Sequence, residues 1–404
     1  MSFDPMSDAF AENPYPAYAR LRRLEGHHYL PELGMVLLAR HDEVTKITLS
    51  PKMVRSLAGF RDEAILAAQK RKENFHDMPY HERFVQTNLL DTDGPEHFRL
   101  RKLVFGAFSG NAVSTLKEDI KRFANKTLGQ LGGRTKIDFM HDVAEHIPGL
   151  VIGKFLGIVE ADAPQLRAWS KRVVQYYDLD RTEEKKQLAE TAVQEFHAYL
   201  VELKREREAR PQDDLISRMI VEEREGHFRS DEFIATCMLV LMAGHGSTID
   251  ALGNGLHALL MHPEAISELR SNGEALPTAI EEMLRYDPPL PFFHRHALEE
   301  VTLSGKTYPV GTTFGLLYAA ANRDETAFEN ADRFDIHRRP NRHLSFGRGA
   351  HLCLGNHLAR MSLQIIFSIL LERFSSIELA GEGAVFKRGL SARGPAQLPI
   401  RLMH

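Results

Sequence analysis

A glycine-rich stretch around one cysteine constrains this chain more than any other feature. It reads Phe346-Gly347-Arg348-Gly349-Ala350-His351-Leu352-Cys353-Leu354-Gly355. The two glycines before the cysteine allow backbone turns that residues with a Cβ resist. An apolar-periodic run follows, to about Leu371, and predicts a helix. The cysteine therefore stands at a helix start, where backbone N–H groups and the positive end of the helix dipole favour a thiolate.

A thiolate at this position suits one kind of metal centre better than others. The only other cysteine, Cys237, is not near Cys353 in the sequence, so a zinc site with several thiolates is disfavoured. Phe346 is placed to shield the sulfur from water. A single, shielded thiolate is a good axial ligand for haem iron. A buried structural cysteine in a glycine-rich turn is the alternative interpretation.

The stretch resembles the haem-binding signature of the cytochrome P-450 family, F-G-x-G-x-H-x-C-x-G, at every fixed position. The resemblance implies a fold that is mainly α with small β-sheets. It also implies one triangular cytochrome P-450 domain, residues 1–404, that encloses a haem b (iron protoporphyrin IX). Cys353 would bind the iron, and Phe346 and Ala243 would lie against the cofactor.

The composition agrees with a soluble globular protein, because 43% of the residues are hydrophobic and 26% are charged. The formal net charge of −4 argues against nucleic acid as a partner. With two cysteines in all, a disulfide framework is not expected and a reducing compartment fits. We see no apolar run long enough to cross a membrane and no signal peptide, so we expect a cytoplasmic protein that is free of membrane. We also expect a monomer.

Four basic side chains are candidates to bind the haem propionates. His97 and Arg101 follow Pro95 in a predicted helix, and their spacing of four places both on one face. Two such donors can bind a carboxylate together. The resemblance assigns this pair to a propionate, and it assigns Arg295 and His351 the same role. A solvated basic face is the alternative for the first pair.

An apolar run from Phe233 to about Met261 predicts a helix roughly 45 Å long, with Ser230 as its cap. Its middle contains two glycines, which are costly inside a helix, and close approach of a flat ligand is one reason to tolerate them. This segment resembles the helix of the family that carries an acid and an alcohol for proton delivery.

The acid position of that helix is occupied by Gly246, which departs from the family pattern. Our hypothesis is that Ser247 and Thr248, with ordered water and Asp250 one turn after the glycine, deliver protons. The alternative is that Asp250 is a buried polar residue with satisfied hydrogen bonds.

A structural charge network is predicted beside the cysteine stretch. Glu282 and Arg285 are three residues apart in a predicted helix and can pair. In this order along the chain they resemble the E-x-x-R motif of the family, which an arginine downstream completes. Arg333 is the expected third member, and Arg338 is the alternative.

The substrate pocket is expected to be largely apolar. The residues assigned to it are Met238, Leu239, Met242, Phe292, Phe293, His294 and Arg393. Arg393 or His294 are candidates to bind an acid group, and exposure to solvent is the alternative for either. Residues 51–90 are charged and irregular by pattern, and the resemblance makes them a loop that closes over substrate.

The resemblance implies a monooxygenase that hydroxylates or epoxidises an apolar small molecule with dioxygen. The chain has no flavin or iron–sulfur domain, so electrons would come from a ferredoxin and its reductase. The docking face would carry Arg99, Lys102 and Arg360. Because Gly246 replaces the acid, a peroxide-using or substrate-assisted oxidase is the first alternative. A non-catalytic haem sensor is the second.

Overall fold

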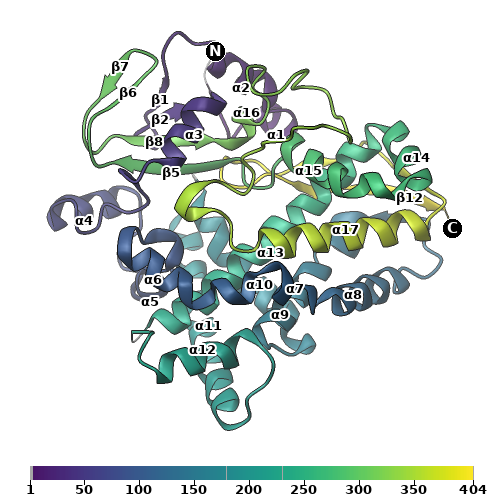
Figure 1. Cartoon of the computed structure of the whole chain (residues 1–404), viewed down its shortest axis with the longest axis horizontal. Coiled ribbons are helices and arrows are strands. Elements are labelled where there is room, and N and C mark those ends of the chain that lie inside the picture. Colours follow the sequence, from purple (N-terminus) through teal and green to yellow (C-terminus); the bar gives the residue numbers. More distant parts are fainter. Residues whose placement is uncertain (1–2, 179, 230, 404) are drawn as a thin grey trace. The chain divides into compact units, whose positions relative to one another are not determined.

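The structure is a computed structural model that describes residues 3–178, 180–229 and 231–403. Its fold is mainly α with small β-sheets, as predicted (Figure 1). The backbone divides into two compact units. Unit 1 comprises Met1–Met53, Ser114–Pro148 and Ser247–His404, and unit 2 comprises Val54–Val113 and Gly149–Gly246. The prediction of a single domain over residues 1–404 stays a prediction.

The strands of unit 1 form small sheets. A five-stranded sheet has the order β1-β2-β8-β5-β3, in which β2 and β8 are parallel and β5 pairs antiparallel with β8. Its strands are β1 (His28–Leu30), β2 (Met35–Leu38), β3 (Met53–Val54), β5 (Phe292–Ala297) and β8 (Thr313–Leu317), of which β3 begins in unit 1 and ends in unit 2. The others are β4 (Lys136–Asp138), β6 (Val301–Leu303), β7 (Lys306–Tyr308), β9 (Ser376–Leu379), β10 (Val385–Phe386), β11 (Pro395–Gln397) and β12 (Pro399–Met403).

Alternation along β5 separates its side chains onto two faces of the sheet. Phe292 packs into a buried cluster with Leu37 and Leu317. Phe293 packs into a different cluster, which contains Leu38 and Tyr318. Because side chains two residues apart share a face, Arg295 follows Phe293 rather than Phe292.

The helices of unit 1 include the one that follows the cysteine stretch. They are α1 (Asp8–Glu12), α2 (Tyr15–Arg22), α3 (His41–Leu49), α8 (Lys117–Gly129), α14 (Pro263–Ser271), α15 (Leu276–Tyr286), α16 (Tyr318–Ala321) and α17 (Asn356–Arg373). Helix α17 packs against α8 and α15 (Figure 1). Leu363, Ile366, Phe367 and Leu370 form its buried face, as the apolar period of the sequence predicted.

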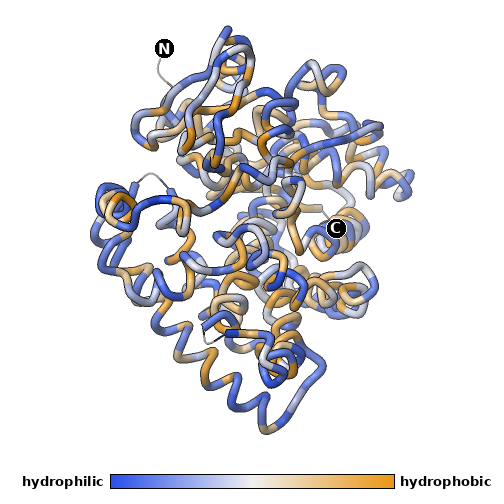
Figure 2. Tube along the Cα trace, turned by 60° about the vertical axis from the view of Figure 1, so that its left-hand side comes forward, coloured by the Kyte–Doolittle hydropathy of each residue, from blue (hydrophilic) through white to orange (hydrophobic). Residues whose placement is uncertain are grey.

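Unit 2 is built almost wholly from helices. They are α4 (Glu63–Lys72), α5 (Pro79–Phe84), α6 (Gly94–Phe105), α10 (Ala163–Val174), α11 (Glu183–Ala209) and α12 (Leu215–Arg224). Three helices contain a boundary between the units, so that each belongs partly to unit 1 and partly to unit 2. They are α7 (Gly110–Ser114), α9 (Ile147–Leu156) and α13 (Glu232–Leu260). Figure 2 shows hydrophilic and hydrophobic residues interleaved along the helical trace, as amphipathic helices require.

Two helices occupy the segment 51–90, for which the sequence pattern predicts an irregular structure. Asp62 caps α4, because its side chain accepts a hydrogen bond from the backbone N–H of Ala64. The last turn of α4 carries Lys70, Arg71 and Lys72, which favour the negative end of the helix dipole. Charge placed at the helix end therefore stabilises a helix that has no buried face, and the irregular interpretation was wrong here.

Helix α13 is the long apolar helix that the sequence predicted. It is long and apolar enough to cross a membrane, but 61% of its most apolar window is buried inside the protein. That burial is typical of a core helix. The predicted cap, Ser230, lies outside the described residues.

Candidate haem site

The cysteine stretch forms a turn stabilised by its own backbone. Gly347 and Gly349 have φ angles of +65° and +71°, which favour glycine. The backbone N–H of Cys353 donates to the carbonyl of Phe346 over 2.9 Å. Cys353 precedes α17 by three residues, and the side-chain amide of Asn356 donates to its carbonyl over 2.6 Å. The predicted turn before a helix is confirmed.

Close packing against α3 explains why position 349 is glycine. A Cβ at Gly349 would lie 2.8 Å from the carbonyl oxygen of Thr48, at the end of α3. Both cysteines are free thiols, so no disulfide competes for the sulfur of Cys353. Burial raises the pKa of the Cys237 thiol, which makes that residue an unreactive part of the core.

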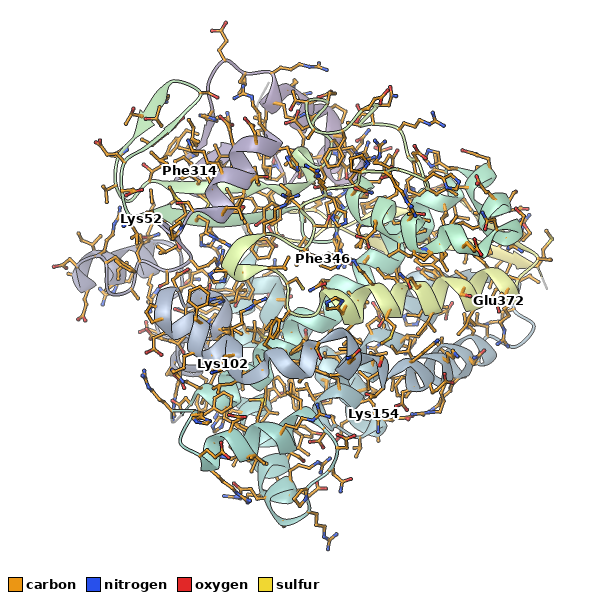
Figure 3. All side chains as sticks on the ribbon, viewed as in Figure 1. Lys52, Lys102, Lys154, Phe314, Phe346 and Glu372 are labelled. Atoms are coloured by element: carbon orange, nitrogen blue, oxygen red, sulfur yellow. The ribbon has the colours of Figure 1, made fainter. Side chains whose placement is uncertain are left out.

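The side chain of Phe346 is contacted by Arg360 of α17, which in turn binds a carboxylate of α15. The guanidinium of Arg360 lies 4.3 Å from the ring centroid of Phe346, and Figure 3 places this ring in the loop before α17. Arg360 donates to both carboxylate oxygens of Glu281, over 2.7 and 2.9 Å. His343 contacts the same carboxylate at 3.1 Å. Burial alone would raise the pKa of Glu281, but hydrogen bonds from His343 and Arg360 lower it to about 2.

A second carboxylate on α15 forms the predicted charge network. Glu282 and Arg285 have fully buried side chains, and the Nε of Arg285 lies 2.7 Å from the Glu282 carboxylate. Arg338 supplies the third charge, because its Nε lies 3.1 Å from the same carboxylate. The prediction that Arg333 completes the network was wrong. The side chain of Arg333 is exposed, and only its carbonyl takes part, by accepting hydrogen bonds from Arg285 and Arg338.

The four predicted propionate donors lie in both units. Arg295 is buried on β5, and its guanidinium donates to the carbonyl of His294 over 2.8 Å. His351 is half-buried in the turn Gly349–His351. His97 and Arg101 lie on α6 of unit 2, where Pro95 is in the first helical turn as predicted. Propionate binding by these residues stays a prediction.

The middle of α13 is less buried than the rest of the helix. Ala243 is exposed, whereas the neighbouring Leu241 and Met242 are buried. A Cβ at Gly244 would lie 2.8 Å from Cδ1 of Ile152 on α9, so this glycine allows helix packing. A Cβ at Gly246 would meet nothing within 4 Å, so packing within the protein does not require this glycine.

Asp250 is tied to the C-terminal strands. Its buried carboxylate lies 2.5 Å from the Nζ of Lys387, which follows β10. A Cβ at Gly394, before β11, would lie 2.4 Å from its Oδ1. This arrangement favours the alternative interpretation of a satisfied buried polar residue, and a role in proton delivery is untested. Ser247 and Thr248 are half-buried on the same helix.

The residues predicted to line a substrate pocket divide among several environments. Met238 and Met242 are buried on α13, and Leu239 is half-buried there. Phe292 and Phe293 point to opposite faces of the sheet, so they do not share one environment. His294 lies beside His296, with ring centroids 5.2 Å apart.

Arg393 does not fit the predicted role of binding a substrate acid. Its Nε donates to the carboxylate of Asp287 over 2.6 Å, and its Nη1 donates to the carbonyl of Ala11 over 2.7 Å. The side chain is buried, with its guanidinium 4.4 Å from the centroid of the Phe386 ring. Because its charge and donors are already satisfied inside the protein, we correct this assignment to a structural one.

Sequence reasoning missed Glu281 and Tyr318. The adjacent Glu282 accounts for the glutamate of the E-x-x-R motif, so no sequence signal indicated that Glu281 binds Arg360 beside the cysteine loop. Tyr318 begins α16, and its hydroxyl lies 3.7 Å from the position of a Cβ on Gly347. A polar residue directly after an apolar strand was the only available signal for it.

The residues of this site fit a thiolate-bound haem. One free cysteine stands in a turn that fixes its backbone, next to a helix N-terminus. The turn also carries the aromatic ring of Phe346, which the guanidinium of Arg360 on α17 contacts. On the same unit, the buried guanidinium of Arg295 and the imidazole of His351 are of the type that binds carboxylates.

Comparisons with known proteins place these features in a family. The family model described as Cytochrome P-450 matches residues 39–385. A polyketide biosynthesis cytochrome P-450 of Bacillus subtilis is 32% identical and covers 100% of this chain and 99% of its own length. The cyclomarin C epoxidase of Salinispora arenicola is 35% identical over 91% of this chain and 90% of its own length.

Solved structures agree with the sequence relatives. The crystal structure of P-450 BioI, in complex with an acyl carrier protein that carries hexadec-9Z-enoic acid, has a TM-score of 0.89 to this chain. The two sequences are 30% identical, and the match covers 98% of this chain and 99% of the other.

Proposed function

This chain belongs to the cytochrome P-450 family, and we propose that it hydroxylates or epoxidises a largely apolar small molecule with electrons from a ferredoxin-type partner. As a member of this family it is a haem-thiolate monooxygenase, which argues against a non-catalytic haem sensor. The observation that carries the proposal is the glycine turn that places Cys353 before α17.

The residues of the site have distinct roles in this proposal. Cys353 holds the haem, which when bound supplies dioxygen activation favoured by electron donation from the thiolate. The carboxylates of Glu281 and Glu282 fix the cysteine loop through Arg360 and Arg285. Ser247 and Thr248 on α13 hold and pass protons through ordered water.

The four basic residues of the sequence analysis would hold the two propionates. They are His97, Arg101, Arg295 and His351. Binding the carboxylates from several elements would orient the haem plane relative to Cys353, and each charge-assisted hydrogen bond is stronger than a neutral one.

Apolar side chains on α13 support an apolar substrate, because Met238, Leu239 and Met242 share this helix with the exposed Ala243. The names of relatives refer to polyketide biosynthesis, to cyclomarin C and to hexadec-9Z-enoic acid on an acyl carrier protein. The test is a ferric absorption titration against apolar acids, terpenoids, steroids and macrolides. A shift of the Soret band towards the high-spin form supports the proposal, and binding confined to polar compounds contradicts it.

The electron donor is proposed to dock on basic residues of the cysteine side. Arg99 is engaged with Glu96 and Glu232, and Arg360 with Glu281, whereas Lys102 is exposed on α6. Enzymes of this family take electrons from redox partners, and the ferredoxin identity is our proposal. Location in the cytoplasm is likewise our proposal, and it agrees with two cysteines that form no disulfide. A monomeric state is also proposed.

A charge reversal tests the docking proposal. We expect Lys102→Glu to slow ferredoxin-dependent reduction at low salt, because steering by opposite charges raises association rates. Lys171→Glu on α10 makes the same charge change at another exposed lysine and serves as the control. Equal reduction rates for both variants and the wild type contradict docking at Lys102.

One observation favours a second candidate function. Gly246 stands where the family pattern has an acid, and packing within the protein does not require it. A glycine that packing does not require, at the position of a proton-delivering acid, fits an oxidase that uses peroxide directly or takes protons from its substrate. Peroxide-driven turnover that matches ferredoxin-driven turnover favours this candidate, and peroxide-driven turnover far below it favours the monooxygenase.

A further inference from the structure

Tyr318 lies against the cysteine loop from the five-stranded sheet. It follows the last residue of β8 and is 3% exposed. Its hydroxyl oxygen is 3.7 Å from the position of a Cβ on Gly347. The carbonyl oxygen of His351 is 3.8 Å from that same position. The hydroxyl therefore reaches the turn that leads to Cys353.

The hydroxyl of Tyr318 has no hydrogen-bond partner within residues 3–178, 180–229 and 231–403. Two other tyrosines of this protein, Tyr15 and Tyr308, show the usual behaviour of a buried hydroxyl, which finds a hydrogen-bond partner. Tyr15 donates to the carbonyl of Tyr286 over 2.7 Å, and the hydroxyl of Tyr308 lies 2.6 Å from Nδ1 of His27. The ring of Tyr318 is buried, but its hydroxyl oxygen keeps some accessible surface, so a ligand that accepts a hydrogen bond can reach it.

The surroundings of Tyr318 identify the charge of that acceptor. Its ring packs on Phe293, with centroids 5.7 Å apart. Arg295 follows Phe293 on the same face of β5, and His351 belongs to the loop that the hydroxyl reaches. A guanidinium on this face of the strand, an imidazole in this loop and the hydroxyl are all donors of the kind that a carboxylate accepts.

We propose that the Tyr318 hydroxyl donates a hydrogen bond to a haem propionate and so positions the haem against the Cys353 loop. Tyr318 is a positioning residue, because it acts through the propionate and not on the reacting atoms. The proposal rests on the haem that the family implies and adds a donor to the propionate-binding set predicted from the sequence. A phenol is uncharged at neutral pH, so it adds a directed hydrogen bond without changing the net charge of the site.

The test is the rate at which ferric holoenzyme loses haem to apomyoglobin. Tyr318→Phe removes one oxygen atom and keeps the ring against Phe293. We expect about tenfold faster haem loss, because a hydrogen bond to a charged group is being removed. We also expect the propionate bending mode in the resonance Raman spectrum to shift, with the thiolate-type carbon monoxide spectrum unchanged.

Tyr308→Phe is the matched control. Tyr308 belongs to the same buried cluster as Tyr318, but its hydroxyl is bonded to His27. We expect this variant to lose haem at the wild-type rate, with an unchanged propionate mode. Equal haem loss from Tyr318→Phe and the wild type overturns the proposal, and so does equal acceleration in both variants.

Haem dimethyl ester, in which both propionates are esterified, separates a direct effect from an indirect one. Reconstituted with this haem, Tyr318→Phe and the wild type should lose it at the same rate, because no carboxylate accepts the bond. If the tenfold difference persists with the ester, the hydroxyl acts through the protein and the proposal is overturned. Absence of the thiolate spectrum in the wild type would instead contradict ligation by Cys353, which is a separate failure.

Discussion

The Asp250 carboxylate lies 2.5 Å from the Lys387 ammonium, so the long core helix α13 is tied to the strands at the end of the chain. Asp250 is buried, whereas the side chain of Lys387 is 41% exposed. Burial raises the pKa of Asp250, and the nearby Lys387 opposes this rise without cancelling it. The ion pair gives Asp250 a structural partner that its place in the sequence did not suggest.

The first prediction concerns Asp250→Asn. Because the folded-state pKa is raised, the folded state favours the protonated acid, so the titration of Asp250 contributes stability at low pH that is lost as pH rises through the folded pKa. Asparagine cannot ionise, so the variant should be at least as stable as the wild type at neutral pH in urea unfolding. If Asp250 is an anchor, coupling of electrons to product should be unchanged. A large loss of coupling with unchanged stability would show that Asp250 delivers protons.

A second prediction compares two glycines on α13. Gly246→Asp restores the acid of the family pattern at a position where a Cβ meets nothing within 4 Å. We expect the variant to fold normally and to raise the ratio of ferredoxin-driven to peroxide-driven turnover. Gly244→Ala is expected to destabilise the protein by about 1–3 kcal/mol, because its Cβ would lie 2.8 Å from Ile152. An unchanged turnover ratio in Gly246→Asp would mean that protons reach the site without an acid at this position.

A third prediction separates the two arginines near Glu282. Arg338→Met should lower the free energy of unfolding by about 3–5 kcal/mol, because it leaves a buried carboxylate short of one partner. Arg333→Met should change it by less than about 0.5 kcal/mol, because the Arg333 side chain is exposed and its carbonyl remains. Urea unfolding of both variants provides the measurement. Similar losses in the two would contradict the assignment of Arg338.

The fourth prediction uses the pH dependence of Glu281. The folded state lowers the pKa of Glu281 to about 2, from an ordinary value of 4.5, so its charge contributes stability above the unfolded pKa that is lost as pH falls towards 2. Glu281→Gln should therefore be less stable than the wild type by about 1–3 kcal/mol at pH 7. The difference should shrink between about pH 5 and pH 2, as followed by urea unfolding at each pH. A difference independent of pH would show that the charge of Glu281 does not matter.

Features set by neighbouring residues could be predicted from the sequence. The turn before α17, the length of α13 and the pairing of Glu282 with Arg285 all depend on residues within a few turns of one another. Sequence pattern records such local requirements directly, because glycine conformations and helical periodicity act over short distances.

Features set by distant contacts could not be predicted. Asp250 and Lys387 are 137 residues apart in the sequence, and Arg393 and Asp287 are 106 apart. No spacing rule connects such pairs, so the sequence predicts a substrate-binding role for Arg393, whereas its charge is satisfied inside the protein. Arg333 was chosen over Arg338 for the same reason, since the choice depends on how the chain turns after α15.

The most direct test of the account is the carbon monoxide spectrum of the reduced haem protein, compared between the wild type and Cys353→Ser. Cys237→Ser is the control, because that thiol is buried in the core and has no role in the site. We predict a thiolate-type Soret band in the wild type and in Cys237→Ser. In Cys353→Ser this band should be lost, whether or not the variant still binds haem. A thiolate-type band that persists in Cys353→Ser would contradict ligation by Cys353 and the function built on it.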